Sequence, residues 1–247
     1  MMVRWLIAAI LSLALPGLPA AASPRAADCP VPDSAMASGP LPGTATALFQ
    51  GDIRILLIGS ATTSSGGASA RDRAWPERLA HILAGRRAET HVEIRREGLR
   101  GSTATDHARL LDDVVPAFRP NLVIWQLGTV EAVRSLSAEE MADTVQTAAA
   151  RLRETRAERT DLILMDPQFS RFLRANADVE TYREKLSQAA YASGAALFSR
   201  WVVMKHWVET GGIDLERAPP AQRAATADRL NECLARALAD FMVGGTR

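Results

Sequence analysis

Short apolar runs alternate along the chain with longer segments in which apolar residues recur every three or four positions. Each short run is bounded by Gly, Pro or charged residues, which is typical of strands buried in a sheet. The pattern predicts five strands, at Ile53–Ile58, Val92–Arg96, Leu122–Leu127, Leu162–Met165 and Ala195–Phe198.

The longer segments predict helices between these strands. Pro76 falls in a first helical turn, where its missing N–H is tolerated, and Ser137 with Glu140 forms a capping-box pattern before a long helix. The predicted helices are Trp75–Leu83, Thr103–Phe118, Ala138–Arg156, Val179–Ala192 and Ala221–Val243.

Strands that alternate with helices favour a parallel sheet covered on both faces, which is a three-layer α/β/α architecture. Ligand sites in such sheets lie beyond the carboxyl ends of the strands. The loops to inspect are Gly59–Gly67, Gly98–Thr103, Gly128–Val130, Asp166–Phe169 and the loop before the last helix.

Residues 1–22 read as a signal peptide. Arg4 gives a basic start, Trp5–Leu15 is apolar but too short to span a bilayer, and Ala20-Ala21-Ala22 resembles a cleavage site. We therefore expect an exported protein, periplasmic or secreted, with no membrane span after cleavage. A retained anchor is the less favoured interpretation.

Residues 23–48, rich in Pro, Ala, Gly and Ser, predict an extended leader, and residues 49–247 predict one domain. The chain carries 29 basic and 28 acidic side chains, so its charges balance. This balance gives no electrostatic reason to bind nucleic acid or acidic membrane surfaces.

The chain has two cysteines, Cys29 and Cys233. In an oxidising compartment such a pair predicts a disulfide, which would join the leader to the last helix. Two unpaired thiols are the alternative. Neither cysteine has a neighbour at the spacing of zinc ligands.

Several segments resemble the SGNH (GDSL-type) hydrolases. In one bacterial branch of that family a first block GSSST precedes a PDLVIWQxGTN strand, an LMDPQ strand, an RxxxMxxW segment and a CLA ending. The corresponding segments here are GSATT (Gly59–Thr63), RPNLVIWQLGTV (Arg119–Val130), LMDPQF (Leu164–Phe169), RWVVMKHW (Arg200–Trp207) and CLARALA (Cys233–Ala239). The resemblance covers nearly the whole chain after the signal peptide and implies a flavodoxin-like fold with a five-stranded parallel sheet.

The same resemblance implies that the catalytic set is degenerate. Ala61 occupies the place of the nucleophilic serine, and Val130 that of an asparagine whose amide stabilises the oxyanion. Gly101 matches the glycine whose backbone N–H also helps to stabilise the oxyanion. Counted back from Cys233 without a gap, Gln222 stands at the place of the aspartate and Ala225 at that of the histidine.

Losing one oxyanion donor lowers a rate roughly 10²–10³-fold, and losing the nucleophile or base removes most of the catalysis. The sequence therefore predicts a pseudoenzyme. Ser60 is the fallback nucleophile, although it reads first as a turn residue. His81, His91 and His107 are interpreted as surface or edge residues.

Asp166 is interpreted as a cap of the following turn, and a base-orienting or metal-binding role is the alternative. No cluster has the spacing of a metal site, and no cofactor is expected.

Ser60, Thr63, Arg100 and Gly101 are the predicted ligand-binding residues. If Arg100 faces the pocket, it would favour an anionic ligand. The alternative is that Arg100 lies exposed on a solvated loop. Three hypotheses follow: a silent hydrolase fold that binds an acyl or carbohydrate group or a cell-envelope protein, an active esterase that uses Ser60, and a structural scaffold of the envelope.

Overall fold

The structure is a computed structural model that describes residues 29–63, 67–86, 90–154 and 160–246. It contains a five-stranded sheet in the order β2-β1-β3-β4-β5, in which every neighbouring pair is parallel. The strands are β1 (Asp52–Ile58), β2 (His91–Glu97), β3 (Leu122–Gln126), β4 (Asp161–Met165) and β5 (Ala196–Phe198). The five predicted strands and their parallel arrangement are confirmed.

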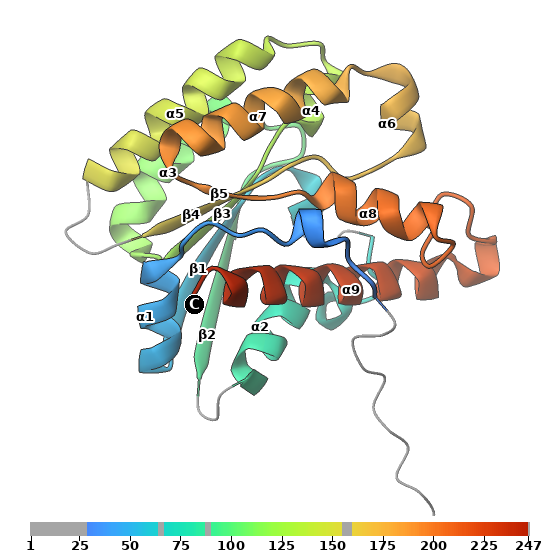
Figure 1. Cartoon of the computed structure of the whole chain (residues 1–247), viewed down its shortest axis with the longest axis horizontal. Coiled ribbons are helices and arrows are strands. Elements are labelled where there is room, and N and C mark those ends of the chain that lie inside the picture. The colour runs from blue at the N-terminus through green and yellow to red at the C-terminus, as the bar shows by residue number, and fades with distance from the viewer. Residues whose placement is uncertain (1–28, 64–66, 87–89, 155–159, 247) are drawn as a thin grey trace, which may run out of the picture.

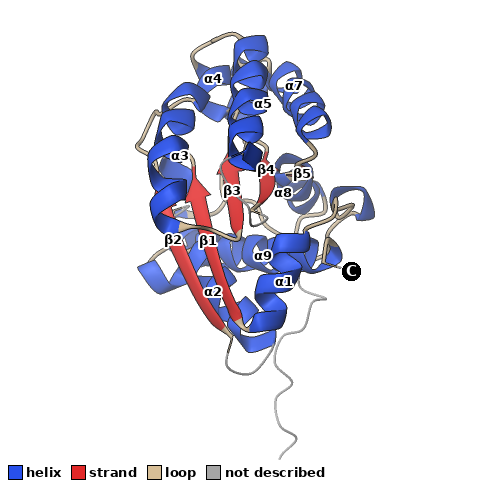
Figure 2. Ribbon diagram, turned by 90° about the vertical axis from the view of Figure 1, so that its left-hand side faces the viewer, coloured by secondary structure: helices blue, strands red, loops and turns tan. Residues whose placement is uncertain are grey.

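Two helical layers enclose the sheet. One layer holds α3 (Ala104–Phe118), α5 (Ala138–Glu154) and α7 (Val179–Ser193), and the other holds α2 (Trp75–Arg86) and α9 (Arg223–Gly244), with α1 (Pro42–Gln50) beside them (Figure 1). Figure 2 shows the sheet between the two layers. Every residue of β3 is buried, which explains its nearly unbroken apolar sequence.

Four helices were missing from the sequence prediction. They are α1, α4 (Thr129–Val133), α6 (Arg171–Asn176) and α8 (Arg200–Glu209). The predicted extended leader is therefore wrong over 42–48, which is helical. The signal peptide prediction lies outside the described residues.

A distant carboxylate explains why α1 forms where composition suggested a loop. Pro42 opens the helix, and the backbone N–H groups of Gly43 and Thr44 donate to the Asp161 carboxylate, at 3.2 and 2.6 Å. Asp161 is the first residue of β4, so the cap comes from another part of the chain. Sequence reading over a local window misses such a cap.

The predicted disulfide between Cys29 and Cys233 is present, with Cα atoms 5.5 Å apart. It ties the described N-terminal segment to α9. Nearby, the indole N–H of Trp207 donates to the carbonyl of Pro30 at 2.7 Å, and the N–H of Leu41 donates to the carbonyl of Gly245 at 2.7 Å. Among the described residues, no helix is long and apolar enough to cross a membrane.

Candidate active site

The loop after β1 turns sharply and presents Ala61. A Cβ atom at Gly59 would lie 2.6 Å from Thr63 Cγ2 and 3.1 Å from Gln126 Cβ, so only glycine fits without displacement. The Thr63 hydroxyl donates to the carbonyl of Ser60 at 2.6 Å and closes the turn. Ala61 itself is exposed, at the start of the short 3₁₀ turn Ala61–Thr63.

The loops at the carboxyl ends of four strands pack tightly together. Gly98 has φ +117°, and a Cβ there would lie 1.9 Å from the Gly59 carbonyl oxygen. A Cβ at Gly128 would lie 3.1 Å from Pro167 Cγ. These contacts join the loops after β1 and β2, and those after β3 and β4. The resulting edge is the one at which ligands bind in parallel sheets.

Little space remains at this edge around Gly101 and Val130, the positions that the resemblance assigns to the oxyanion donors. Gly101 has φ +83°, and Arg134 Nη2 lies 2.8 Å from where its Cβ would be. Val130, on α4, lines a hollow of about 10 Å³, enough for one water molecule. The Thr129 hydroxyl, buried next to Val130, has no hydrogen-bond partner within the described structure.

One serine and one histidine do lie together, but not at the predicted positions. Ser102 Oγ is 2.7 Å from His107 Nε2, and the Trp125 indole N–H donates to His107 Nδ1 at 3.1 Å. Because an indole nitrogen is only a donor, Nδ1 must accept and Nε2 carries the proton. Neutral His107 therefore donates to Ser102 and cannot remove its proton. The Ser102 hydroxyl in turn donates to the carbonyl of Leu99 at 2.6 Å.

The interpretation of His107 as a surface or edge residue is wrong, because its side chain is 1% exposed. Burial lowers the pKa of His107 to about 4, against opposing effects of Asp106 and the backbone of Gly59. The imidazole is consequently neutral near pH 7. His81 and His91 are exposed, as expected.

The positions aligned with the aspartate and histidine of the SGNH hydrolases hold side chains that cannot act as an acid or a base. Gln222 ends a short 3₁₀ turn (Pro220–Gln222), Ala225 lies in the first turn of α9, and both are exposed. Asp228, one turn further, accepts hydrogen bonds from the backbone and hydroxyl of Ser69, at 2.8 and 2.6 Å. It anchors the loop that follows Ala61 to α9.

An open cavity lies on the other side of Ala61. It measures about 420 Å³, and half of its lining is apolar side chains from α8, α9 and the two loops around them. These apolar residues are Phe169, Met204, Val208, Ile213, Leu215 and Leu230. Of the four predicted ligand-binding residues, none lines this cavity. Ser60 borders the small hollow, Thr63 is buried, Gly101 packs against Arg134, and Arg100 is exposed.

An ion cluster holds one wall of this cavity. The Arg171 guanidinium donates to both carboxylate oxygens of Asp214, at 2.8 and 2.7 Å, and its backbone N–H donates to Glu216 at 2.9 Å. The hydrogen bonds from Arg171 hold the pKa of Asp214 below its usual range. Asp214 and Glu216 line the cavity, so the cluster joins α6 to the loop before α9.

Asp166 is buried at the end of β4, but it does not cap the following turn as expected. Its carboxylate accepts from the backbone N–H of Trp201 at 2.8 Å and from Arg183 at 2.9 Å, so it caps α8. Burial raises the pKa of Asp166 to about 6, although these hydrogen bonds oppose the shift. In the described part of the chain, no group of three His, Cys, Asp or Glu is placed to hold a metal.

Arg200 is buried beside this carboxylate. Its guanidinium donates to the side-chain oxygens of Gln126 and Gln168, at 3.1 and 3.3 Å. Burial lowers the pKa of Arg200 to about 10, so the side chain stays charged at neutral pH. Gln168 also lines the cavity beside Ala61. The RxxxMxxW segment thus contributes a buried arginine, Arg200, and part of the cavity wall, through Met204.

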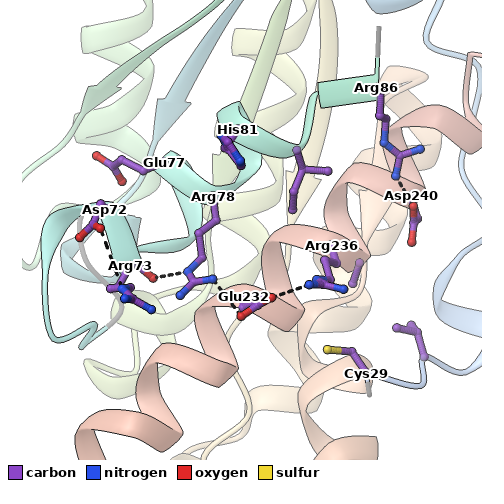
Figure 3. A pocket seen from close by; sticks show the side chains of 13 residues that line it. Cys29, Asp72, Arg73, Glu77, Arg78, His81, Arg86, Glu232, Arg236 and Asp240 are labelled. Carbon is purple, nitrogen blue, oxygen red and sulfur yellow. Dashed lines mark hydrogen bonds and ion pairs between the residues drawn. The ribbon is translucent and has the colours of Figure 1, made fainter. Parts of the chain in front are cut away.

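A larger cavity, of about 570 Å³, lies between α2 and α9 beside Cys29. Figure 3 shows that its charged side chains face one another across the groove. Arg78 pairs with Glu232 at 2.9 Å, Arg236 pairs with the same carboxylate, and Arg86 pairs with Asp240. The arginines drawn there have acidic neighbours, so this groove offers no excess charge to a ligand.

Comparisons with known proteins agree with this architecture. The model of the non-GDSL lipase-like family matches residues 28–247. The chain belongs to this family. For the non-GDSL lipase-like protein described here, a comparison with curated proteins found no match.

Solved structures similar to this non-GDSL lipase-like protein include two acetylxylan esterases. A catalytic mutant of Axe2, an acetylxylan esterase from Geobacillus stearothermophilus, has a TM-score of 0.60 and 16% identity over 77% of this chain and 94% of that one. The acetyl xylan esterase AlAXEase gives 0.60 and 15%, over 75% and 98%. TesA gives 0.55 and 18%, over 75% and 97%. At these identities the likeness shows the shared fold.

Proposed function

We propose that this non-GDSL lipase-like protein binds an acyl or carbohydrate group in the cavity beside Ala61 and does not hydrolyse esters. One observation carries the proposal: a methyl group stands where the cavity meets the nucleophile's position. A methyl group cannot attack a carbonyl. The cavity itself is open and of ligand size, at about 420 Å³.

The apolar lining supports an apolar ligand group. Burial of apolar surface contributes roughly 25 cal/mol per Å², so an acyl chain or the face of a sugar ring would gain affinity there. Polar side chains in the lining, including Gln168, Ser170 and Asp214, would orient the ligand. The cavity of ligand size counts against a purely structural scaffold, whereas the very small hollow beside Val130 favours loss of catalysis.

The proposal includes export to the periplasm or beyond. The disulfide between Cys29 and Cys233 supports it, because disulfides persist in oxidising compartments. Fractionation of cells that express the full chain tests this part. Recovery of the protein from the cytoplasm with an intact N-terminus would contradict it.

Binding can be tested with a matched pair of variants. Ala61→Phe places a ring at the cavity wall, and Ala225→Phe places the same ring on an exposed turn outside the cavity. Titration calorimetry with acetylated xylo-oligosaccharide and with a medium-chain glycerol ester should show binding that Ala61→Phe abolishes and Ala225→Phe retains. Equal binding by both variants would exclude this cavity.

An esterase with a relocated serine is the second candidate. It is favoured by the contact between Ser102 and His107 and by the half-buried Ser60 beside Ala61, but the tautomer of His107 argues against it. Treatment with a fluorophosphonate should give no covalent labelling. Labelling that disappears in Ser60→Ala or Ser102→Ala would establish an active serine and overturn the proposal of a silent site.

A further inference from the structure

Gln168, in the wall of the cavity beside Ala61, has a side-chain amide of defined orientation. It lies in the loop after β4 and is half-buried. Its side-chain oxygen accepts a hydrogen bond from Arg200 Nη2 at 3.3 Å. Because an arginine side chain carries only donors, the atom that faces Arg200 must be the amide oxygen. The amide NH₂ group is therefore the end of Gln168 that remains for a ligand.

Arg200 is placed to hold this orientation. Its side chain is buried at the start of α8, and Nη1 donates to the side-chain oxygen of Gln126 at 3.1 Å. Gln126 is the last residue of β3, so this hydrogen bond ties the guanidinium to the buried sheet. A flipped Gln168 amide would direct its own donors at those of a buried cation, which costs free energy. The orientation with the oxygen toward Arg200 is therefore the stable one.

The other polar side chains of the cavity have no donor to spare. In the described part of the chain, the polar side chains of the lining are those of Gln168, Ser170, Asp214 and Glu216. The two carboxylates only accept. Although burial opposes the shift, hydrogen bonds that include one from the Ser170 hydroxyl lower the pKa of Glu216, so that hydroxyl is already engaged. By contrast, no hydrogen bond within the described residues engages Gln168 Nε2.

We propose that the cavity binds an acyl compound through its carbonyl oxygen, which accepts a hydrogen bond from the Gln168 amide NH₂ group. Arg200 is the positioning residue that keeps this donor turned toward the cavity. Little space remains around Gly101 and Val130, so a carbonyl group needs a donor elsewhere. The apolar lining would hold the chain attached to the carbonyl carbon. This inference rests on the proposed function and specifies its ligand.

Two ligands that differ in a single carbonyl group test the inference. Titration calorimetry compares monooctanoyl glycerol, an ester, with the octyl ether of glycerol, in which a CH₂ group replaces the carbonyl. The wild-type protein should bind the ester about fivefold more tightly, which is the scale of one hydrogen bond. Gln168→Glu keeps an acceptor toward Arg200 but offers the ligand no donor. It should therefore lose the preference for the ester and still bind the ether.

Two further variants serve as control and as a test of the positioning residue. Gln188→Glu introduces the same negative charge at an exposed position of α7, outside the cavity, and should keep the preference for the ester. Arg200→Lys keeps the positive charge but lacks the planar fork that contacts both glutamines. It should lose the preference for the ester and bind the ether as the wild type does.

The outcomes separate this inference from the proposed function. If the wild-type protein bound neither compound, an acyl ligand and this inference would both be excluded. Equal affinities for ester and ether in the wild type, or a preference that Gln168→Glu retains, would overturn the carbonyl contact alone and leave the cavity as a ligand site. A folded Arg200→Lys variant that keeps the preference would overturn the positioning role. Circular dichroism of each variant verifies the fold.

Discussion

Ala61 places a methyl group at the position that the resemblance to the SGNH hydrolases assigns to a serine nucleophile. Restoring the hydroxyl with Ala61→Ser should leave hydrolysis of aryl acetates within a few-fold of the wild-type rate. A serine needs a positioned base, and Ala225 is aligned with the histidine base and Gln222 with the aspartate that orients it; both are exposed.

Initial rates for wild type and for Ala61→Ser, corrected for buffer hydrolysis, provide the measurement. Ala225→Ser is the control for a serine added outside the cavity. An increase above 100-fold in Ala61→Ser alone, on the scale of a catalytic triad, would mean that a base is already in place.

His107 should couple stability to pH. Its folded pKa is lowered to about 4 from 6.5, so the unfolded chain binds the proton first as the pH falls. Its contribution to the free energy of unfolding is present above about pH 6.5 and is lost progressively toward pH 4. Asp166, with its pKa raised to about 6, acts in the opposite direction over an overlapping range.

The difference in unfolding free energy between wild type and His107→Gln isolates the histidine, because Asp166 is common to both. This difference should grow in favour of wild type as the pH rises from 4 to 6.5. Urea unfolding at several pH values measures it, with the exposed His81→Gln as control. A constant difference across that range would show that His107 does not titrate as a buried group.

At the residue scale, the sequence indicated which side chains of the SGNH catalytic set the chain lacks, but not how the residues around those positions pack. The absence of a serine at position 61 is visible in the letters themselves. The burial of His107 is not visible, because its partners Trp125 and Ser102 come from a strand and a loop whose approach only the fold defines. Likewise, nothing in the sequence indicated that Arg134 would pack on Gly101.

Among the elements, α3 and α4 share one buried carboxylate. Glu131 accepts from the N–H of Ala104 at 2.7 Å and from the N–H of Gly128 at 3.1 Å, so it serves the first turns of both helices. Glu131→Gln replaces one acceptor oxygen by a donor and leaves a buried N–H without a partner. We expect a loss of about 3 kcal/mol in the free energy of unfolding.

Chemical denaturation measures this loss. Glu140→Gln, at an exposed position of α5, is the control and should change stability by less than about 0.5 kcal/mol. Equal losses of unfolding free energy in the two variants would show that the buried Glu131 carboxylate contributes no more to stability than an exposed one.

Sequence patterns predicted the long elements and missed the short ones for a physical reason. The five strands and the helices of ten or more residues that pack one face on the sheet have clear periodicity. By contrast, α4 and α6 have five and six residues and are held by caps. In α8 the buried residues Arg200, Val203, Met204 and Trp207 do lie on one helical face. That face contains a charged arginine, and Val202 and Val208 lie outside it, so the contrast between apolar and polar positions is weak.

For the whole molecule, the disulfide should contribute a large share of stability. It closes a loop with a sequence separation of 204, for which the chain-entropy relation gives about 5 kcal/mol. Reduction with dithiothreitol should lower the denaturation midpoint strongly. The double variant Cys29→Ser with Cys233→Ala should be equally unstable and insensitive to the reductant. An unchanged midpoint after verified reduction would contradict the estimate.

The disulfide also determines how the molecule responds to mechanical force. A pull applied before Cys29 and after α9 passes through the covalent bond into the last turns of that helix. The sheet and the cavity beside Ala61 lie within the closed loop, so they are outside the path of the load. With the bond intact, stretching the chain by its ends should unravel part of α9 and leave the five strands folded.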